Sequence, residues 1–207
     1  MHGMSQPLNE RFNAEERRKL RFLYLLSEDF MLKFYDIDED YVKYLQSIDG
    51  QIPNIGYDTN NKFICGIVLN INDYNYYAPI SSNPQIQRTN LPIFDKHNKV
   101  IATIRFCFMF PALLSVLTEK NFKSINSVDS KYADLLAIEY NYCLSNEKKI
   151  LDKAKSVYNI GCNKNHLLNY TCCDFKLLEL KITEDIVNIQ LLEAQKQTAS
   201  EKQELIS

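Results

Sequence analysis

The chain has 207 residues, 45% of them hydrophobic, with only 5 Gly and 6 Pro, a composition that excludes collagen-like and disordered classes and predicts one domain with a sizeable core. The formal net charge of −2 does not by itself favour a nucleic-acid partner, although basic groups gathered on one face would still permit one. No apolar run approaches the roughly 18–20 residues that span a bilayer, and no signal-peptide pattern opens the chain. We therefore expect a cytoplasmic protein with no membrane partner.

The first 30 residues look like an addition to the domain. Leu20, Leu23 and Tyr24 have helical spacing, which predicts a weak amphipathic helix over 13–26. From Met31 onwards the sequence becomes rich in apolar and aromatic residues, which is typical of a strand. Two interpretations stay open: residues 1–30 form a native N-terminal helix, or they are not native because translation starts at Met31.

The next part of the chain alternates short strands, turns and one helix. A helix is expected over 38–48, where Tyr41, Tyr44, Leu45 and Ile48 share one face. Strands are expected from Met31 and at 63–71, 76–80, 91–94 and 100–109, with turns at 72–75 and 95–98 and polar loops at 53–61 and 81–90. Short strands with local connections favour a twisted antiparallel sheet or a small barrel.

From residue 111 onwards the pattern becomes helical. Helices are expected over 112–117 and 132–151, and Gly161 is expected to end the helix that follows as a left-handed cap. Residues 175–180 form a strand or a helix, and 182–207 an acidic amphipathic helix. We therefore expect an α+β fold with an extension at 1–30, a domain at 31–181 and a C-terminal helix at 182–207.

A basic stretch lies in this helical half, where residues 147–164 carry five lysines and two acids. Such charge runs are usually solvated helix surfaces. A surface that binds RNA is the alternative, because lysines on one face attract the phosphate backbone. The candidate RNA-binding residues are Lys148, Lys149, Lys153 and Lys155, together with Arg88 in the loop 81–90.

The six cysteines are scattered and mostly lie in apolar surroundings, as reduced thiols of cytosolic proteins do. Cys162, His166 and the pair Cys172-Cys173 could supply nitrogen and sulfur ligands for zinc, but the paired Cys-x-x-Cys spacing is missing. We expect structural thiols, no metal site and no cofactor.

A cation and two hydroxyls frame the predicted hairpin 63–80. Lys62 precedes its first strand, and Ser81 and Ser82 follow its second, so antiparallel pairing would bring the ammonium group beside the hydroxyls. Tyr57 and the polar residues of the loop 81–90 adjoin them. This combination suits a phosphodiester, whose transition state accumulates negative charge on oxygen. The alternative is an ordinary turn sequence beside a solvated lysine.

Several segments, in order over about residues 31–181, share a pattern with a known family. They include Phe-Tyr at 34–35, Tyr-Val-Lys-Tyr-Leu at 41–45, Phe-Ile-Cys-Gly-Ile-Val-Leu at 63–69, Tyr-Ala-Pro-Ile-Ser-Ser at 77–82, the apolar strand 104–111 and Cys-Asp-Phe-Lys-Leu-Leu-Glu at 173–179. These resemble the ToxN/AbiQ toxins. The resemblance implies a Kid/MazF-like core with surrounding helices, and an endoribonuclease toxin of a type III toxin–antitoxin system.

The resemblance also assigns residues. The catalytic serine falls on Ser82, its hydroxyl-bearing neighbour on Ser81, the lysine before the strand on Lys62, and a loop tyrosine approximately on Tyr57. The family also has a lysine two residues after the serine, where this chain has Pro84. Arg88 is a candidate to take over the role of that lysine. None of these groups has an ordinary pKa near 7, so the sequence identifies no general base.

The reaction that the resemblance implies is metal-independent attack of the substrate 2′-OH on the adjacent phosphorus, giving a 2′,3′-cyclic phosphate and a 5′-OH. The implied partners are cellular and phage RNA as substrates and an inhibitory antitoxin RNA, repeat-derived and pseudoknotted, in a closed assembly such as three toxins with three RNAs. Two other functions stay open: a catalytically inactive RNA-binding or interaction module, and a protein adaptor acting through the helix 182–207.

Overall fold

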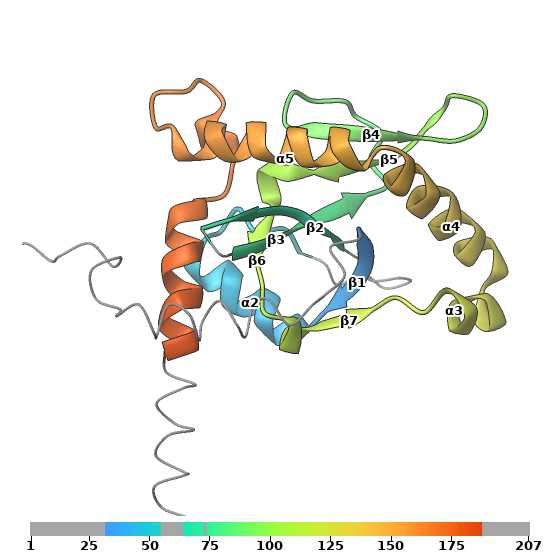
Figure 1. The fold of residues 1–207 in the computed structure, drawn as a ribbon, viewed down its shortest axis with the longest axis horizontal. Coiled ribbons are helices and arrows are strands. Elements are labelled where there is room, and N and C mark those ends of the chain that lie inside the picture. The colour runs from blue at the N-terminus through green and yellow to red at the C-terminus, as the bar shows by residue number, and fades with distance from the viewer. Residues whose placement is uncertain (1–31, 55–63, 73, 188–207) are drawn as a thin grey trace, which may run out of the picture.

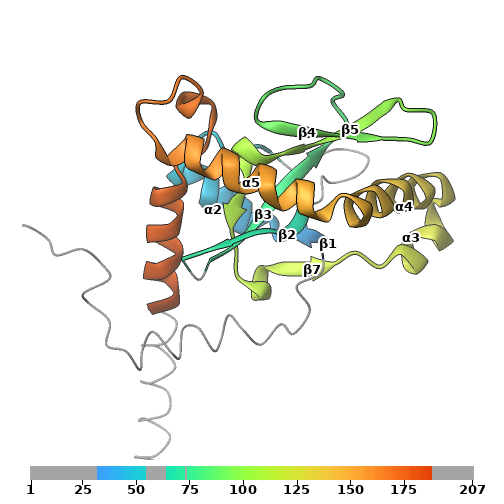
Figure 2. The ribbon, with the colours of Figure 1, turned by 45° about the horizontal axis from the view of Figure 1, so that its top comes forward.

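The computed structural model describes residues 32–54, 64–72 and 74–187. Several predictions lie outside these ranges: the helix 13–26, most of the loop 53–61, Tyr57, Lys62 and the part of the predicted helix 182–207 that follows residue 187. Within them, short strands and local connections produce one antiparallel sheet flanked by helices (Figures 1 and 2). The expected α+β class with an antiparallel sheet is confirmed.

The described strands form a sheet in the order β4-β5-β3-β2-β1-β7, with β6 pairing with β3. The predicted hairpin of β2 and β3 lies at the centre of this sheet. Asn72, with a φ of 51°, begins the tight turn between the two strands. The seven strands are β1 (Lys33–Ile37), β2 (Ile64–Ile71), β3 (Tyr74–Ser81), β4 (Asn90–Phe94), β5 (Val100–Arg105), β6 (Phe110–Pro111) and β7 (Leu117–Glu119).

Most helices begin where the sequence supplies a side-chain cap. Asp38 accepts a hydrogen bond from the Tyr41 backbone N–H at 2.9 Å, and Asp129 and Asp174 cap later helices in the same way. The helices are α2 (Glu39–Ile48), α3 (Phe122–Val128), α4 (Ser130–Ser145), α5 (Glu147–Cys162) and a helix that covers 175–187 of the described chain, with short 3₁₀ turns at η2 (Phe106–Phe108), η3 (Leu114–Val116) and η4 (Asn169–Thr171).

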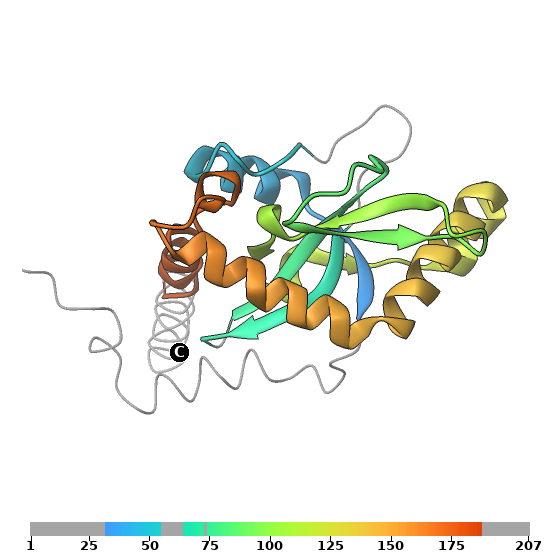
Figure 3. The ribbon, with the colours of Figure 1, turned by 90° about the horizontal axis from the view of Figure 1, so that it is seen from above.

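The sheet lies between α4 and α5 on one side and α2 on the other (Figure 3). Alternate residues of each strand face opposite sides. On one side, Phe34 packs edge-on against Tyr140 of α4 and Tyr76 packs against Tyr158 of α5. On the other side, the ring of Tyr77 in β3 lies over Gly66, its cross-strand partner in β2. A Cβ atom at Gly66 would come within 2.0 Å of that ring. The core therefore occupies both faces of the sheet.

A buried carboxylate fastens the helix 175–187 to the rest of the domain. Glu179 is 6% exposed, and its Oε1 accepts hydrogen bonds from the hydroxyls of Tyr76 at 2.8 Å and Tyr158 at 2.6 Å. Its Oε2 forms an ion pair with Lys176 at 2.9 Å. Burial and the carboxylate together raise the pKa of both tyrosines. Partners for both oxygens offset the cost of burying this charge.

Three helix predictions were wrong. Residues 112–117 were expected to be helical, but the chain forms η3 and then β7, which pairs with β1 at Tyr35 and Glu119. The single helix expected over 132–151 is two, because Asn146 interrupts it and turns its amide onto the Tyr142 carbonyl at 2.9 Å. Gly161 is not a left-handed cap, since α5 continues through it to Cys162 and no described glycine has a positive φ.

Two ends were also misplaced. The strand expected over 100–109 stops at Arg105, where the 3₁₀ turn η2 begins. Residues 175–180, for which both a strand and a helix were considered, are helical, so the helix expected from 182 already begins at 175.

Among the described helices, none is long and apolar enough to cross a membrane.

Candidate functional site

The start of β2 does lie beside the end of β3. Their register pairs Ile64 with Pro79, two residues before Ser81. This is the antiparallel arrangement on which the predicted juxtaposition of Lys62 with the serines depends. Lys62 and Tyr57 themselves lie outside the described residues, so their distances to the serines stay predictions.

Buried polar side chains hold the loop 82–89 in place after the serines. The hydroxyl of Thr103 donates to the Asn83 carbonyl at 3.0 Å. The Asn90 amide donates to the Gln85 carbonyl and accepts from the backbone N–H of Gln87, both at 2.9 Å. Because Thr103 is 0% and Asn90 2% exposed, these anchors are shielded from water. Ser82 is therefore exposed at a bend, and the loop residues that follow it are held in place.

The strands β4, β5 and β3 have an apolar face and a polar face. Directly opposed residues of antiparallel strands point to the same side, so each cross-strand row shares a face. One row contains Leu91, Ile104 and Ile80, and the next contains Pro92, Thr103 and Ser81. Since neighbouring residues alternate, Ser81 faces away from the side that Leu91 faces.

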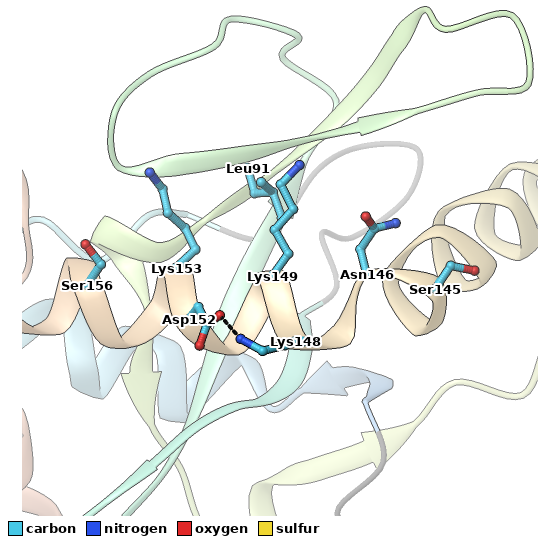
Figure 4. Close-up of a pocket in the computed structure, with 8 residues that line it drawn as sticks. All are labelled: Leu91, Ser145, Asn146, Lys148, Lys149, Asp152, Lys153 and Ser156. Carbon is cyan, nitrogen blue, oxygen red and sulfur yellow. Dashed lines mark hydrogen bonds and ion pairs between the residues drawn. The ribbon is translucent and has the colours of Figure 1, made fainter.

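The apolar side leads to a pocket of about 600 Å³ between α5 and β4. Figure 4 shows Lys149 and Lys153 pointing from α5 toward β4, where Leu91 forms the wall. Lys148 instead turns along the helix and pairs with Asp152 at 2.6 Å. The pocket is lined by Leu91, Ser145, Asn146, Lys148, Lys149, Asp152, Lys153 and Ser156.

The predicted residues therefore fall on two surfaces. Lys148, Lys149 and Lys153 line the α5 pocket, while Lys155 is exposed on the same helix and is not among the lining residues. The serines lie at the end of β3, and Arg88 is exposed in the loop that follows. The structure thus brings the lysines together with one another but not with the Ser81 side of the sheet.

Sequence reasoning missed the polar groups beneath the loop. Asn90 was predicted to end the polar loop 81–90, and Thr103 and Arg105 to belong to a strand, yet all three form the polar face with Ser81. Arg105 donates from Nε to the Thr103 hydroxyl at 3.1 Å. The alternation of Thr103 and Arg105 with apolar neighbours was a visible signal, but only the register shows which residues lie opposite the serine.

The cysteines are structural thiols, as expected. All six are unpaired, and all but Cys162 are buried. Burial raises the pKa of Cys172 to about 11, which keeps its thiol protonated at neutral pH. In the described part of the chain, no three His, Cys, Asp or Glu side chains gather as metal ligands, so the zinc alternative at Cys162 and His166 finds no support in the geometry.

Comparison with known proteins identifies the family. Residues 33–183 match the model of the toxin ToxN of type III toxin–antitoxin systems. The chain belongs to this ToxN family. Among curated relatives, it is 27% identical to the endoribonuclease ToxN of Pectobacterium atrosepticum, over 72% of this chain and 91% of that protein. It is 26% identical to the endoribonuclease AbiQ of Lactococcus lactis subsp. lactis, over 73% and 88%.

Solved structures of ToxN-family proteins share the fold. One, described as a type III toxin inhibited selectively by a non-coding RNA pseudoknot, superposes with a TM-score of 0.69 at 23% identity and covers 74% of this chain and 96% of that one. The anti-phage endoribonuclease AbiQ gives a TM-score of 0.64 at 26% identity, with the same coverage. The expected family and class of activity, an endoribonuclease toxin of a type III system, are confirmed.

Proposed function

We propose that this ToxN-family protein cleaves RNA at the Ser81–Ser82 end of β3. The observation that supports this site most directly is the loop 82–89, which buried Thr103 and Asn90 hold against the polar face so that Ser82 is exposed at a fixed bend. Fixed donors stabilise a charged transition state better than mobile ones, because they need no reorganisation during the reaction.

In the proposed reaction the substrate 2′-OH attacks the adjacent phosphorus and the 5′-oxygen leaves, which gives a 2′,3′-cyclic phosphate and a 5′-OH. The protein holds the 2′-oxygen in line and stabilises the phosphorane oxygens. Ser82 and Ser81 donate hydrogen bonds to the phosphate, and Lys62 supplies positive charge. Tyr57 stacks on a base or orients the phosphate. These four residues act through their own side chains, so the proposed reaction is independent of a metal ion.

The α5 pocket is the proposed second surface, for RNA that inhibits the toxin. Lys149 and Lys153 face it without an ion-pair partner among the described residues, so both charges are available to phosphates. The exposed Lys148 and Lys155 extend this surface, and the exposed Arg88 is a proposed RNA contact on the other surface, in the loop that follows the serines. By analogy with the relative inhibited by an RNA pseudoknot, the proposed partner is a pseudoknotted antitoxin RNA, which the family resemblance implies to be repeat-derived.

The proposal extends to the organisation of the molecule. Residues 31–181 form the endoribonuclease domain, 1–30 an extension and 182–207 an acidic C-terminal segment, whose described part continues the helix that begins at 175. Toxin and antitoxin RNA form a closed assembly, such as three of each, in the cytoplasm, where the substrates are cellular and phage RNA.

The test is incubation of the purified full chain with mixed cellular RNA in EDTA, with mapping of the cleavage ends. We expect cuts with 5′-OH ends, and a loss of rate on the order of 100-fold or more in Ser82→Ala. Ser115→Ala, an exposed serine of η3, serves as the matched control and should cut normally. Cleavage that persists in Ser82→Ala places the site elsewhere, and a folded wild-type chain that cuts nothing favours the inactive RNA-binding module.

A further inference from the structure

Arg105 shares the polar face of the sheet with the serines. The register pairs Thr103 with Ser81 and Arg105 with Asn90, and Thr103 and Arg105 are two residues apart on one strand. Residues two apart on a strand face the same side. The Arg105 side chain therefore leaves the sheet on the face opposite to the α5 pocket. On that face, the row of Arg105 and Asn90 is next to the row that contains Ser81.

The guanidinium is oriented by the same hydroxyl that anchors the loop. Arg105 Nε donates to Thr103 Oγ1 at 3.1 Å, and that hydroxyl donates onward to the Asn83 carbonyl at 3.0 Å. Thr103 is completely buried, so this chain of hydrogen bonds has a fixed origin. Arg105 is itself half-buried, which limits the conformations of its side chain.

Arg105 has donors left for a ligand. Across the described ranges, no carboxylate forms an ion pair with it. Its Nε is used by Thr103, while the terminal amino groups make no hydrogen bond within those ranges. Arginine stays charged at any physiological pH, and its planar fork matches the geometry of a phosphate.

We propose that Arg105 is a phosphate-binding residue of the Ser81–Ser82 site. It adds a positive charge to this site, where the loop position Pro84 carries none. This rests on the proposed function, because it takes the ligand to be a phosphodiester of the RNA strand held at Ser82. The fork binds the non-bridging oxygens while the serine hydroxyls approach the same group from β3.

The experiment compares the full-length wild type with Arg105→Gln, Arg105→Lys and the control Lys131→Gln, an exposed charge on α4. Two readouts are needed: kcat/KM for RNA cleavage, and the salt dependence of binding to a 2′-O-methyl RNA that the proposed reaction cannot cleave. We expect Arg105→Gln to lose about 100-fold in kcat/KM. Its slope of log K against log salt should fall by about 0.7, the value for one phosphate contact on a single strand.

Arg105→Lys keeps the charge but not the fork, so it should keep the slope and lose part of kcat/KM. Wild-type kcat/KM and slope in a folded Arg105→Gln would overturn the proposal. If Arg105→Gln does not fold, Arg105→Lys decides: reduced kcat/KM at an unchanged Tm supports the assignment, and wild-type kcat/KM refutes it. Inactivity of Ser82→Ala beside an active Arg105→Gln would leave the proposed function standing and this inference wrong.

Discussion

Glu139 is a buried acid whose carboxyl lacks a full set of partners. It lies on the inner face of α4, is 4% exposed, and its Oε2 has no hydrogen-bond partner among the residues that the structure describes. Burial raises the pKa of Glu139 from 4.5 to about 7. The folded protein therefore binds this proton more tightly than the unfolded chain does, and the stability that Glu139 contributes below pH 4.5 is lost as the pH rises toward 7.

Glu139→Gln should accordingly raise the free energy of unfolding at pH 8 by up to about 3 kcal/mol. At pH 4.5 the same substitution should change the free energy of unfolding little. Urea unfolding at both pH values measures this difference. Asp134→Asn, which removes an exposed carboxylate from the same helix, is the control and should show no such pH dependence. An equal effect of Glu139→Gln at both pH values would contradict the raised pKa.

At the scale of elements, the contact between α5 and the helix 175–187 depends on a missing side chain. A Cβ atom at Gly161 would lie 2.4 Å from Cε2 of Phe175, a fully buried ring stacked on Tyr158. Alanine normally stabilises a helix interior by about 1 kcal/mol relative to glycine. Here the clash reverses the sign, and Gly161→Ala should lower the free energy of unfolding by about 1–3 kcal/mol.

Thermal or urea unfolding checks this prediction against Gly50→Ala, a site where a Cβ atom meets nothing within 4 Å. Gly50→Ala should change stability by less than about 0.5 kcal/mol. A stabilised Gly161→Ala protein would show that the two helices can move apart at no cost.

The elements that could be predicted are those that local pattern specifies. The helix α2 and the hairpin of β2 and β3 follow from spacing and turn residues close in the sequence. β7 could not be found, because a three-residue strand exists only through pairing with β1, about 80 residues away. The polar face beneath the serines was hidden for a related reason: it depends on register, and a slip of one residue would turn Ser81 to the other side.

At the scale of the whole molecule, the α5 pocket makes a prediction about RNA affinity. Replacing both Lys149 and Lys153 by glutamine should weaken RNA binding and reduce the slope of log K against log salt by about 1.4–1.8. The matched control is the exposed pair Lys123→Gln with Lys131→Gln on α3 and α4. Filter binding or anisotropy over a salt series measures both, and equal slopes in the two double variants would remove RNA from this pocket.

The two opposed faces of the β4–β5–β3 sheet have a consequence for stoichiometry. A ligand lying along α5 leaves the Ser81 side uncovered, so one compact RNA cannot occupy both sides of a single protomer unless it passes around the free edge at β4. Each protomer would then have a valence of two, and so would each inhibitory RNA that bridges neighbours. Bivalent components that alternate head to tail close into rings with equal numbers of both, or grow without limit when the rotation does not close.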